Sequence, residues 1–188
     1  MKLTMAMMLL PLFLACAKGP EPVVHYAEND PFTGKLVINE VVAEKTMTLG
    51  EFGEPADRFE LYNTGSEDLL LKEGEWFVSD AGPDDPKKFK LPETLVPART
   101  TVVVWCDKVD DTSLGIHTNF ALAASGEHIV LYHQVGGVGT VIDEVVFTKD
   151  GMPGPVCARY PDGVGEWVLP KRSTPGATNE PARYAATE

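Results

Sequence analysis

The sequence predicts an all-β sandwich, and three observations support this fold class. From Lys35 onward, short apolar or alternating runs are separated by clusters of Gly, Pro, Asn and Asp, which is the pattern of strands joined by turns. The runs recur about every ten residues, a spacing typical of a sandwich or barrel. No segment carries the apolar periodicity of a convincing helix.

The expected strands follow directly from these runs. They cover residues 35–43, 58–62, 76–79, 87–91, 100–106, 128–133, 140–147 and 157–160. Turns are expected where Gly or Asn can adopt positive φ, at residues 63–65, 80–83, 125–126, 136–137 and 161–163. The glycine-rich residues 136–139 lack the following helix and lysine of a phosphate-binding loop, so we interpret them as a hairpin turn.

The N-terminus has the features of a secretory signal peptide. A lysine precedes the apolar residues 3–14, a run shorter than the roughly 20 residues of a membrane-spanning helix. The ending Leu-Phe-Leu-Ala-Cys at residues 12–16 resembles the bacterial lipobox, which implies cleavage before Cys16 and lipidation of its thiol. Because Ala17 rather than Asp follows, the resemblance also implies an outer-membrane location, periplasmic or surface-facing. An ordinary signal peptide with an incidental Cys16 is the alternative.

The chain after this lipoprotein signal peptide, residues 1–15, divides into three parts. Residues 16–34 are polar, contain several prolines and show no periodicity, so we expect a flexible tether. Residues 35–179 have the length of a single domain with its own core. Residues 180–188 are small and polar, and we expect a disordered tail.

The charge balance excludes one large class of partner. The chain has 28 Asp and Glu against 16 Lys and Arg, a formal net charge of −12. Affinity for nucleic acid depends on neutralising phosphates with basic side chains, so we expect no DNA or RNA partner.

Several short motifs follow one another in a recognisable order. They are residues 37–40 (VINE), 59–65 (FELYNTG), 76–80 (WFVSD), 95–98 (LVPA), 102–105 (VVVW), 117–120 (HTNF), 125–127 (SGE), 159–163 (RYPDG), 166–167 (EW) and 173–177 (STPGA) with Asn179. This order resembles the lamin tail domain, the immunoglobulin-like sandwich of nuclear lamins that also occurs in exported bacterial proteins. The resemblance covers residues 35–179 and implies an antiparallel immunoglobulin-like β-sandwich.

The same resemblance implies a function in binding rather than catalysis. The family is defined by a scaffold for interaction, with no catalytic constellation of its own. We therefore expect a cell-envelope lipoprotein without enzymatic activity or cofactor, attached to the membrane through its lipid, that binds an envelope protein or polymer. Because lamin-tail domains are appended to secreted hydrolases, an accessory module of such an enzyme is an alternative.

A calcium-dependent adhesion domain is the other alternative, because two loops are rich in aspartate. The residues are Asp80, Asp84 and Asp85 in one loop, and Asp107, Asp110 and Asp111 in the other. Calcium prefers several oxygen ligands from such loops. The spacing matches no defined calcium loop, however, so we predict a solvated acidic loop and no metal site.

The remaining candidates for chemistry have structural interpretations. Glu40 and Glu60 could form the carboxylate pair of a glycosidase, but we expect buried carboxyls bonded to turn amides. No spacing among the histidines, which are His25, His117, His128 and His133, resembles a zinc site. We expect His117 to hydrogen-bond a loop.

Tryptophan and cysteine complete the set of candidates. Trp76, Trp105 and Trp167 lie in strand or motif contexts, so core packing is favoured over a carbohydrate platform. Cys106 and Cys157 are an even pair in an exported protein, and either a disulfide or two buried thiols is open.

Overall fold

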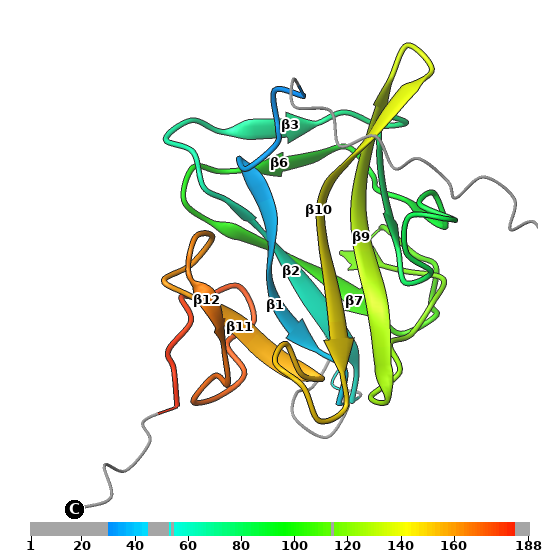
Figure 1. The fold of residues 1–188 in the computed structure, drawn as a ribbon. Helices are drawn as coiled ribbons and strands as arrows, with labels where there is room; N and C mark the ends of the chain where they lie inside the picture. Colours follow the sequence, from blue (N-terminus) through cyan, green and yellow to red (C-terminus); the bar gives the residue numbers. More distant parts are fainter. Residues whose placement is uncertain (1–29, 45–52, 54, 114, 183–188) are drawn as a thin grey trace, which may run out of the picture.

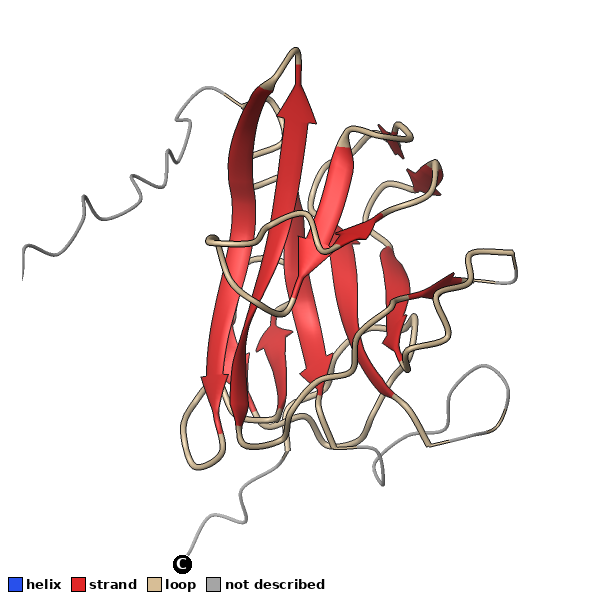
Figure 2. Cartoon of the chain, turned by 90° about the vertical axis from the view of Figure 1, so that its right-hand side faces the viewer, coloured by secondary structure: helices blue, strands red, loops and turns tan. Residues whose placement is uncertain are grey.

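The computed structural model describes residues 30–44, 53, 55–113 and 115–182 (Figure 1). Within these residues the regular structure is entirely β, with no helix (Figure 2). The predicted all-β class is therefore confirmed. None of the described segments is a helix long and apolar enough to cross a membrane.

The strands follow the predicted runs closely. They are β1 (Leu36–Val42), β2 (Asp57–Asn63), β3 (Leu69–Leu71), β4 (Trp76–Ser79), β5 (Phe89–Lys90), β6 (Thr94–Val96), β7 (Thr101–Cys106), β8 (Ile116–His117), β9 (Gly126–Val135), β10 (Val138–Thr148), β11 (Val156–Tyr160) and β12 (Glu166–Val168). Each predicted strand is present. The strands β3, β6, β8 and β12 were not predicted, because two or three residues are too few to establish an alternating pattern.

The strands form two main sheets and a small ribbon. One sheet has the order β12-β11-β1-β2-β7-β8, the second has the order β10-β9-β4-β5, and β3 pairs with β6. Neighbouring strands are antiparallel except for the pair β7 and β8. The sheets pack as a sandwich of immunoglobulin-like character, as predicted.

The core lies between the sheets and follows the alternation of their strands. In β2, Phe59 and Leu61 belong to the core cluster, where they join Trp76 of β4 and Leu131 of β9. Successive side chains of a strand point to opposite faces. The polar residues that alternate with Phe59 in β2 therefore lie on the outer face of the six-stranded sheet.

One side of the sandwich is closed by a contact between its two sheets. The strands β1 and β10 lie side by side (Figure 1), and the backbone N–H of Ile38 donates to Oδ2 of Asp143 at 2.7 Å. Both strands have a register shift here, between Ile38 and Glu40 in β1 and between Val141 and Asp143 in β10. The irregularity leaves a backbone donor without a ladder partner, and Asp143 satisfies it.

The β9–β10 hairpin projects beyond the end of the sandwich where β3 and β6 lie (Figure 1). Its turn is formed by Gly136 and Gly137, whose φ values of 60° and 84° require glycine or a residue that tolerates left-handed backbone. This confirms the predicted hairpin turn. The end of β9 and the start of β10 therefore lie near the β3–β6 ribbon (Figure 1).

The two expected flexible segments are partly ordered. Phe32 packs against the core, with its ring centroid 4.9 Å from that of Trp76, so the predicted tether extends too far at its C-terminal end. At the other terminus, Lys171 N–H donates to the Glu180 carbonyl at 2.7 Å and Ala182 N–H to the Leu169 carbonyl at 2.9 Å. Phe32 lies far from Trp76 in the sequence, whereas Glu180 and Ala182 bond to segments that closely precede them. Residues 1–29, which include the expected signal peptide and Cys16, and residues 183–188 lie outside the described residues.

Candidate functional site

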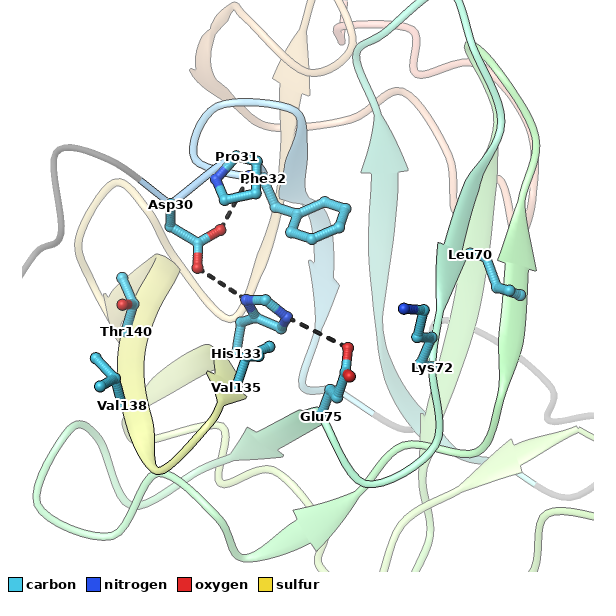
Figure 3. A pocket seen from close by; sticks show the side chains of 10 residues that line it. All are labelled: Asp30, Pro31, Phe32, Leu70, Lys72, Glu75, His133, Val135, Val138 and Thr140. Carbon is cyan, nitrogen blue, oxygen red and sulfur yellow. Dashed lines mark hydrogen bonds and ion pairs between the residues drawn. The ribbon is translucent and has the colours of Figure 1, made fainter.

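A pocket of about 450 Å³ opens at the end of the sandwich from which the β9–β10 hairpin projects (Figure 3). Its lining comes from four separate segments. The residues are Asp30, Pro31, Phe32, Leu70, Lys72, Glu75, His133, Val135, Val138 and Thr140. The volume is within the usual range for a small-ligand site, roughly 300–1,000 Å³.

His133 lies at the base of this pocket with only 5% of its side chain exposed. Its Nδ1 lies 2.8 Å from Oδ2 of Asp30, and its ring stacks against Trp76 with centroids 4.4 Å apart. A second ring, that of Phe32, meets it edge-on at 5.0 Å. Because an ionised carboxylate can only accept, we assign Nδ1 as a donor to Asp30. The imidazole is thus fixed in both position and orientation.

The other ring nitrogen of His133 has no hydrogen-bond partner. Nε2 is buried, and Oε2 of Glu75 lies 3.8 Å from it (Figure 3). That separation is too long for a hydrogen bond. A buried polar atom without a partner costs about 1–3 kcal/mol. The pair of His133 and Glu75 is therefore incomplete where it faces the pocket.

Exposed aliphatic side chains surround the mouth of the pocket. Val135 and Val138 flank the hairpin turn, and Leu70 lies opposite them. Leu95 is the cross-strand neighbour of Leu70 in the β3–β6 ribbon and is also exposed, although it does not line the pocket. We call these four residues the aliphatic rim. Exposed apolar residues grouped beside polar groups are typical of an interaction site.

Glu40 and Glu60, the candidate glycosidase pair, are brought together around an arginine. Arg58 donates through Nη2 to Glu40 at 2.9 Å and through Nη1 to Glu60 at 2.6 Å, and all three side chains are fully buried. Glu60 also accepts the backbone N–H of Gly176 at 3.1 Å. The expectation of buried carboxyls is therefore correct, and one turn amide is among the partners. Arg58 was missed because its partners cannot be inferred from spacing.

Burial changes the proton affinity of this cluster. Desolvation raises the pKa of Glu60 from 4.5 to about 8, the positive charge of Arg58 opposes the shift, and the charge of Glu40 adds to it. Two carboxylates share one guanidinium, so protonation of one acid leaves the cluster neutral. These groups are closed to solvent and cannot receive a substrate in this conformation.

The C-terminal motif residues cover the cluster. Ser173 accepts from Arg58 Nη2 at 2.8 Å. Asn179 donates to the backbone carbonyl of Asn39 at 3.3 Å, while the Asn39 side chain accepts from Gly163 N–H at 2.8 Å. Through these hydrogen bonds, the segments after β11 are held against the outer face of the six-stranded sheet.

The other histidines make local contacts. His117 Nδ1 lies 2.7 Å from Oδ2 of Asp107, which follows β7, so the predicted loop contact is confirmed. His128 Nε2 lies 2.9 Å from Oε2 of Glu144 on the adjacent strand. His25 lies outside the described residues.

The aspartate loops use their carboxylates to stabilise turns and to pair with lysine. Asp107 accepts from Val109 N–H at 3.1 Å and Asp111 from Ser113 N–H at 2.8 Å, a contact that lowers the pKa of Asp111. Asp80 pairs with Lys88. In the described part of the chain, neither these residues nor Asp84, Asp85 and Asp110 join a group of three side chains that could hold a metal ion.

The two cysteines are free and buried. Cys106 lies on β7 and Cys157 on β11, with β1 and β2 between them in the sheet. Three interstrand spacings of about 4.8 Å place them roughly 14 Å apart, whereas a disulfide needs Cα atoms within about 7 Å. The disulfide alternative is therefore wrong for this fold.

The tryptophans pack as predicted. Trp76 and Trp105 are buried, and Trp167 is partly buried against the core cluster. The guanidinium of Arg159 lies over the Trp167 ring, 4.6 Å from its centroid. Each of the three indole rings thus packs against other side chains of the described residues.

Of the polar groups at the base of the pocket, the sequence indicated only one as a candidate. His133 was a candidate, whereas Asp30 was assigned to the tether and Glu75 was not considered. The Asp-Pro pair at residues 30–31 is a turn signal that could have indicated an ordered start. Asp30 does accept from Phe32 N–H at 2.9 Å, as such turns require. The pairing of Asp30 with His133 had no local signal.

Fold and pocket together define the protein as an immunoglobulin-like β-sandwich that has, at one end, a pocket with polar groups at its base and an aliphatic rim. Neither a protein-family model nor the sequence of a curated protein matches this chain at a significant level.

Proposed function

We propose that this protein is a non-catalytic, lipid-anchored component of the cell envelope that binds an envelope protein or polymer. The observation that carries the proposal is the aliphatic rim around the pocket. Val138 is 73% exposed and lies on a projecting hairpin beside Val135, with Leu70 across the opening. Sites on projecting loops of a rigid sandwich are commonly used for binding.

A lamin-tail relationship is part of the proposal. It is supported by the ordered motifs and by the sandwich itself, in which motif residues such as Asn39, Asn63 and Asn179 bind backbone groups of distant segments. Domains of this type serve as interaction scaffolds, so the relationship agrees with a binding role.

Lipid anchoring at Cys16, proposed for the outer membrane, would limit the distance between the pocket and the membrane. Asp30 lines the pocket and is the first described residue. At roughly 3.5 Å per residue, the chain from Cys16 to Asp30 reaches at most about 50 Å. The rim would then be presented close to the membrane surface, where envelope partners are found.

Site-specific photocrosslinking in intact cells tests the binding role. A photoreactive residue replaces Val138 in one variant and Val164 in a matched control, which is 76% exposed on the β11–β12 turn. We expect a discrete crosslinked species from position 138 that is absent from position 164. Equal crosslinking at both positions, or none at 138, contradicts the proposal.

A further inference from the structure

We propose that the pocket binds the lysine or arginine side chain of a partner protein, with the aliphatic rim contacting apolar residues on either side of that cation. The inference rests on the proposed function, because it takes the hairpin end as the binding surface. It adds the chemical class of the group that enters the pocket.

The incomplete pair at the base of the pocket determines which group fits. In the tautomer that carries its proton on Nδ1 and donates it to Asp30, the imidazole presents Nε2 as an acceptor, and the Glu75 carboxylate is a second acceptor 3.8 Å away. A nitrogen about 2.9 Å from each atom satisfies both. It must supply two protons from one centre, which an ammonium, a guanidinium or a primary amide does and a single hydroxyl does not.

Charge favours the same occupant. Asp30 is nine-tenths buried and Glu75 about two-thirds buried, whereas Lys72 is exposed. Buried charges are screened less than exposed ones, so the carboxylates dominate the potential inside the pocket. An anionic group would add a third negative charge there. The formal net charge of −12 also favours the approach of a basic partner.

The walls suit the long stem of a basic side chain. Leu70, Val135 and Val138 supply aliphatic surface between the mouth and His133. Lysine and arginine bury their methylene stems against such surface while the charged end finds polar partners. Apolar neighbours of the cation would lie on the rim.

A peptide titration followed by NMR tests the inference. The probe is an acetylated and amidated pentapeptide, Val-Leu-Lys-Leu-Val, with analogues in which Lys is replaced by Arg, Gln or Glu. The protein is the full chain with Cys16→Ser, so that it carries no lipid. We expect the Lys and Arg peptides to give saturable shifts of the His133 ring and Val138 methyl signals, and the Gln and Glu peptides to bind at least tenfold more weakly.

Matched variants assign the effect to the pocket. Glu75→Gln keeps the shape of the side chain and should weaken the Lys peptide at least tenfold, while Val138→Ser should weaken it severalfold. Glu73→Gln is the charge control, because Glu73 pairs with Lys90 at 2.9 Å and lies outside the pocket lining. Val164→Ser is the apolar control. Both controls should bind within twofold of the parent, and thermal unfolding checks that all variants fold.

Three outcomes overturn the inference. They are equal affinity for the Lys and Gln peptides, no saturable shift with either basic peptide, and shifts of the same signals by anionic lipid vesicles in place of peptide. Failure of the peptides together with crosslinking at position 138 would reject the cationic occupant alone. Failure of both experiments would reject the binding surface.

Discussion

Replacing Arg58 with methionine tests the buried charge cluster on the outer face of the six-stranded sheet. The guanidinium donates to Glu40, Glu60 and Ser173 at 2.6–2.9 Å, and the side chains of Arg58 and both acids are fully buried. Methionine has similar length and no charge. The substitution leaves Glu40 and Glu60 facing each other without a compensating cation.

The burial of the cluster determines how much stability Arg58→Met should cost. Removing one partner of a buried ion pair costs about 3–5 kcal/mol, because the remaining charge is neither solvated nor paired. For a chain of this size, each kcal/mol lowers Tm by about 2–4 °C, so we expect a decrease of roughly 6–20 °C. The free energy of unfolding is measured by urea denaturation followed by circular dichroism.

Two further variants make the test decisive. Arg172→Met removes an exposed arginine next to Ser173, which binds Arg58. This control should change the free energy of unfolding by about 0.5 kcal/mol or less. The triple variant Glu40→Leu, Arg58→Met, Glu60→Leu should regain most of the loss, since apolar replacements of a whole buried ion cluster are often neutral. A loss below about 1 kcal/mol for Arg58→Met would refute the assigned role of the cluster.

The remaining predictions concern pH, the membrane and the thiols. The pKa of Glu60 is raised from 4.5 to about 8 in the fold, so the stability it contributes is complete below pH 4.5 and is lost as pH rises through 8; Tm should fall over that window, and Glu60→Gln should flatten the profile. Cys16→Ser should move the protein from the membrane fraction to the soluble fraction, and retention on membranes after a salt wash would contradict lipid anchoring. Burial raises the pKa of Cys106 and raises that of Cys157 to about 12, and both thiols are free and buried, so both should react with a thiol reagent only after unfolding and without prior reduction. Rapid reaction in the native state would contradict their burial.

Local pattern was sufficient to predict the long strands. The alternation of residues 128–133 and 140–147 and the glycines between them specify a hairpin, since strand period and turn chemistry agree there. The alternation of β2 is equally clear, and it assigns Arg58 and Glu60 to the outer face of the sheet, where exposure is the usual result. Burial of Glu60 was expected, but its cause was not: residues 173–177 from the far end of the chain cover that face and also bury Arg58. Covering by a distant segment leaves no trace in the local period.

The pocket could not be predicted for the same reason. Asp30, Glu75 and His133 come from three segments whose proximity depends on how β4, β9 and the N-terminal turn pack together. His133 Nδ1 lies 2.8 Å from the Asp30 carboxylate and Nε2 lies 3.8 Å from the Glu75 carboxylate. These two distances differ by only about one ångström. They decide whether His133 is satisfied, and only tertiary packing sets them.

Two other features of the surface support the hairpin end as the site of the proposed binding. Open sheet edges invite indiscriminate pairing, and here the long β10 strand is closed against β1 by the contact of Asp143 with Ile38. A second pocket of about 410 Å³, lined in part by Met152 and Leu169, lies at the opposite end of β10. Within the described residues, none of the buried side-chain polar atoms that lack a partner belongs to that second pocket, whereas Nε2 of His133 belongs to the first. Since an unpaired buried acceptor is costly and a bound donor removes that cost, binding at the hairpin end gains polar as well as apolar free energy.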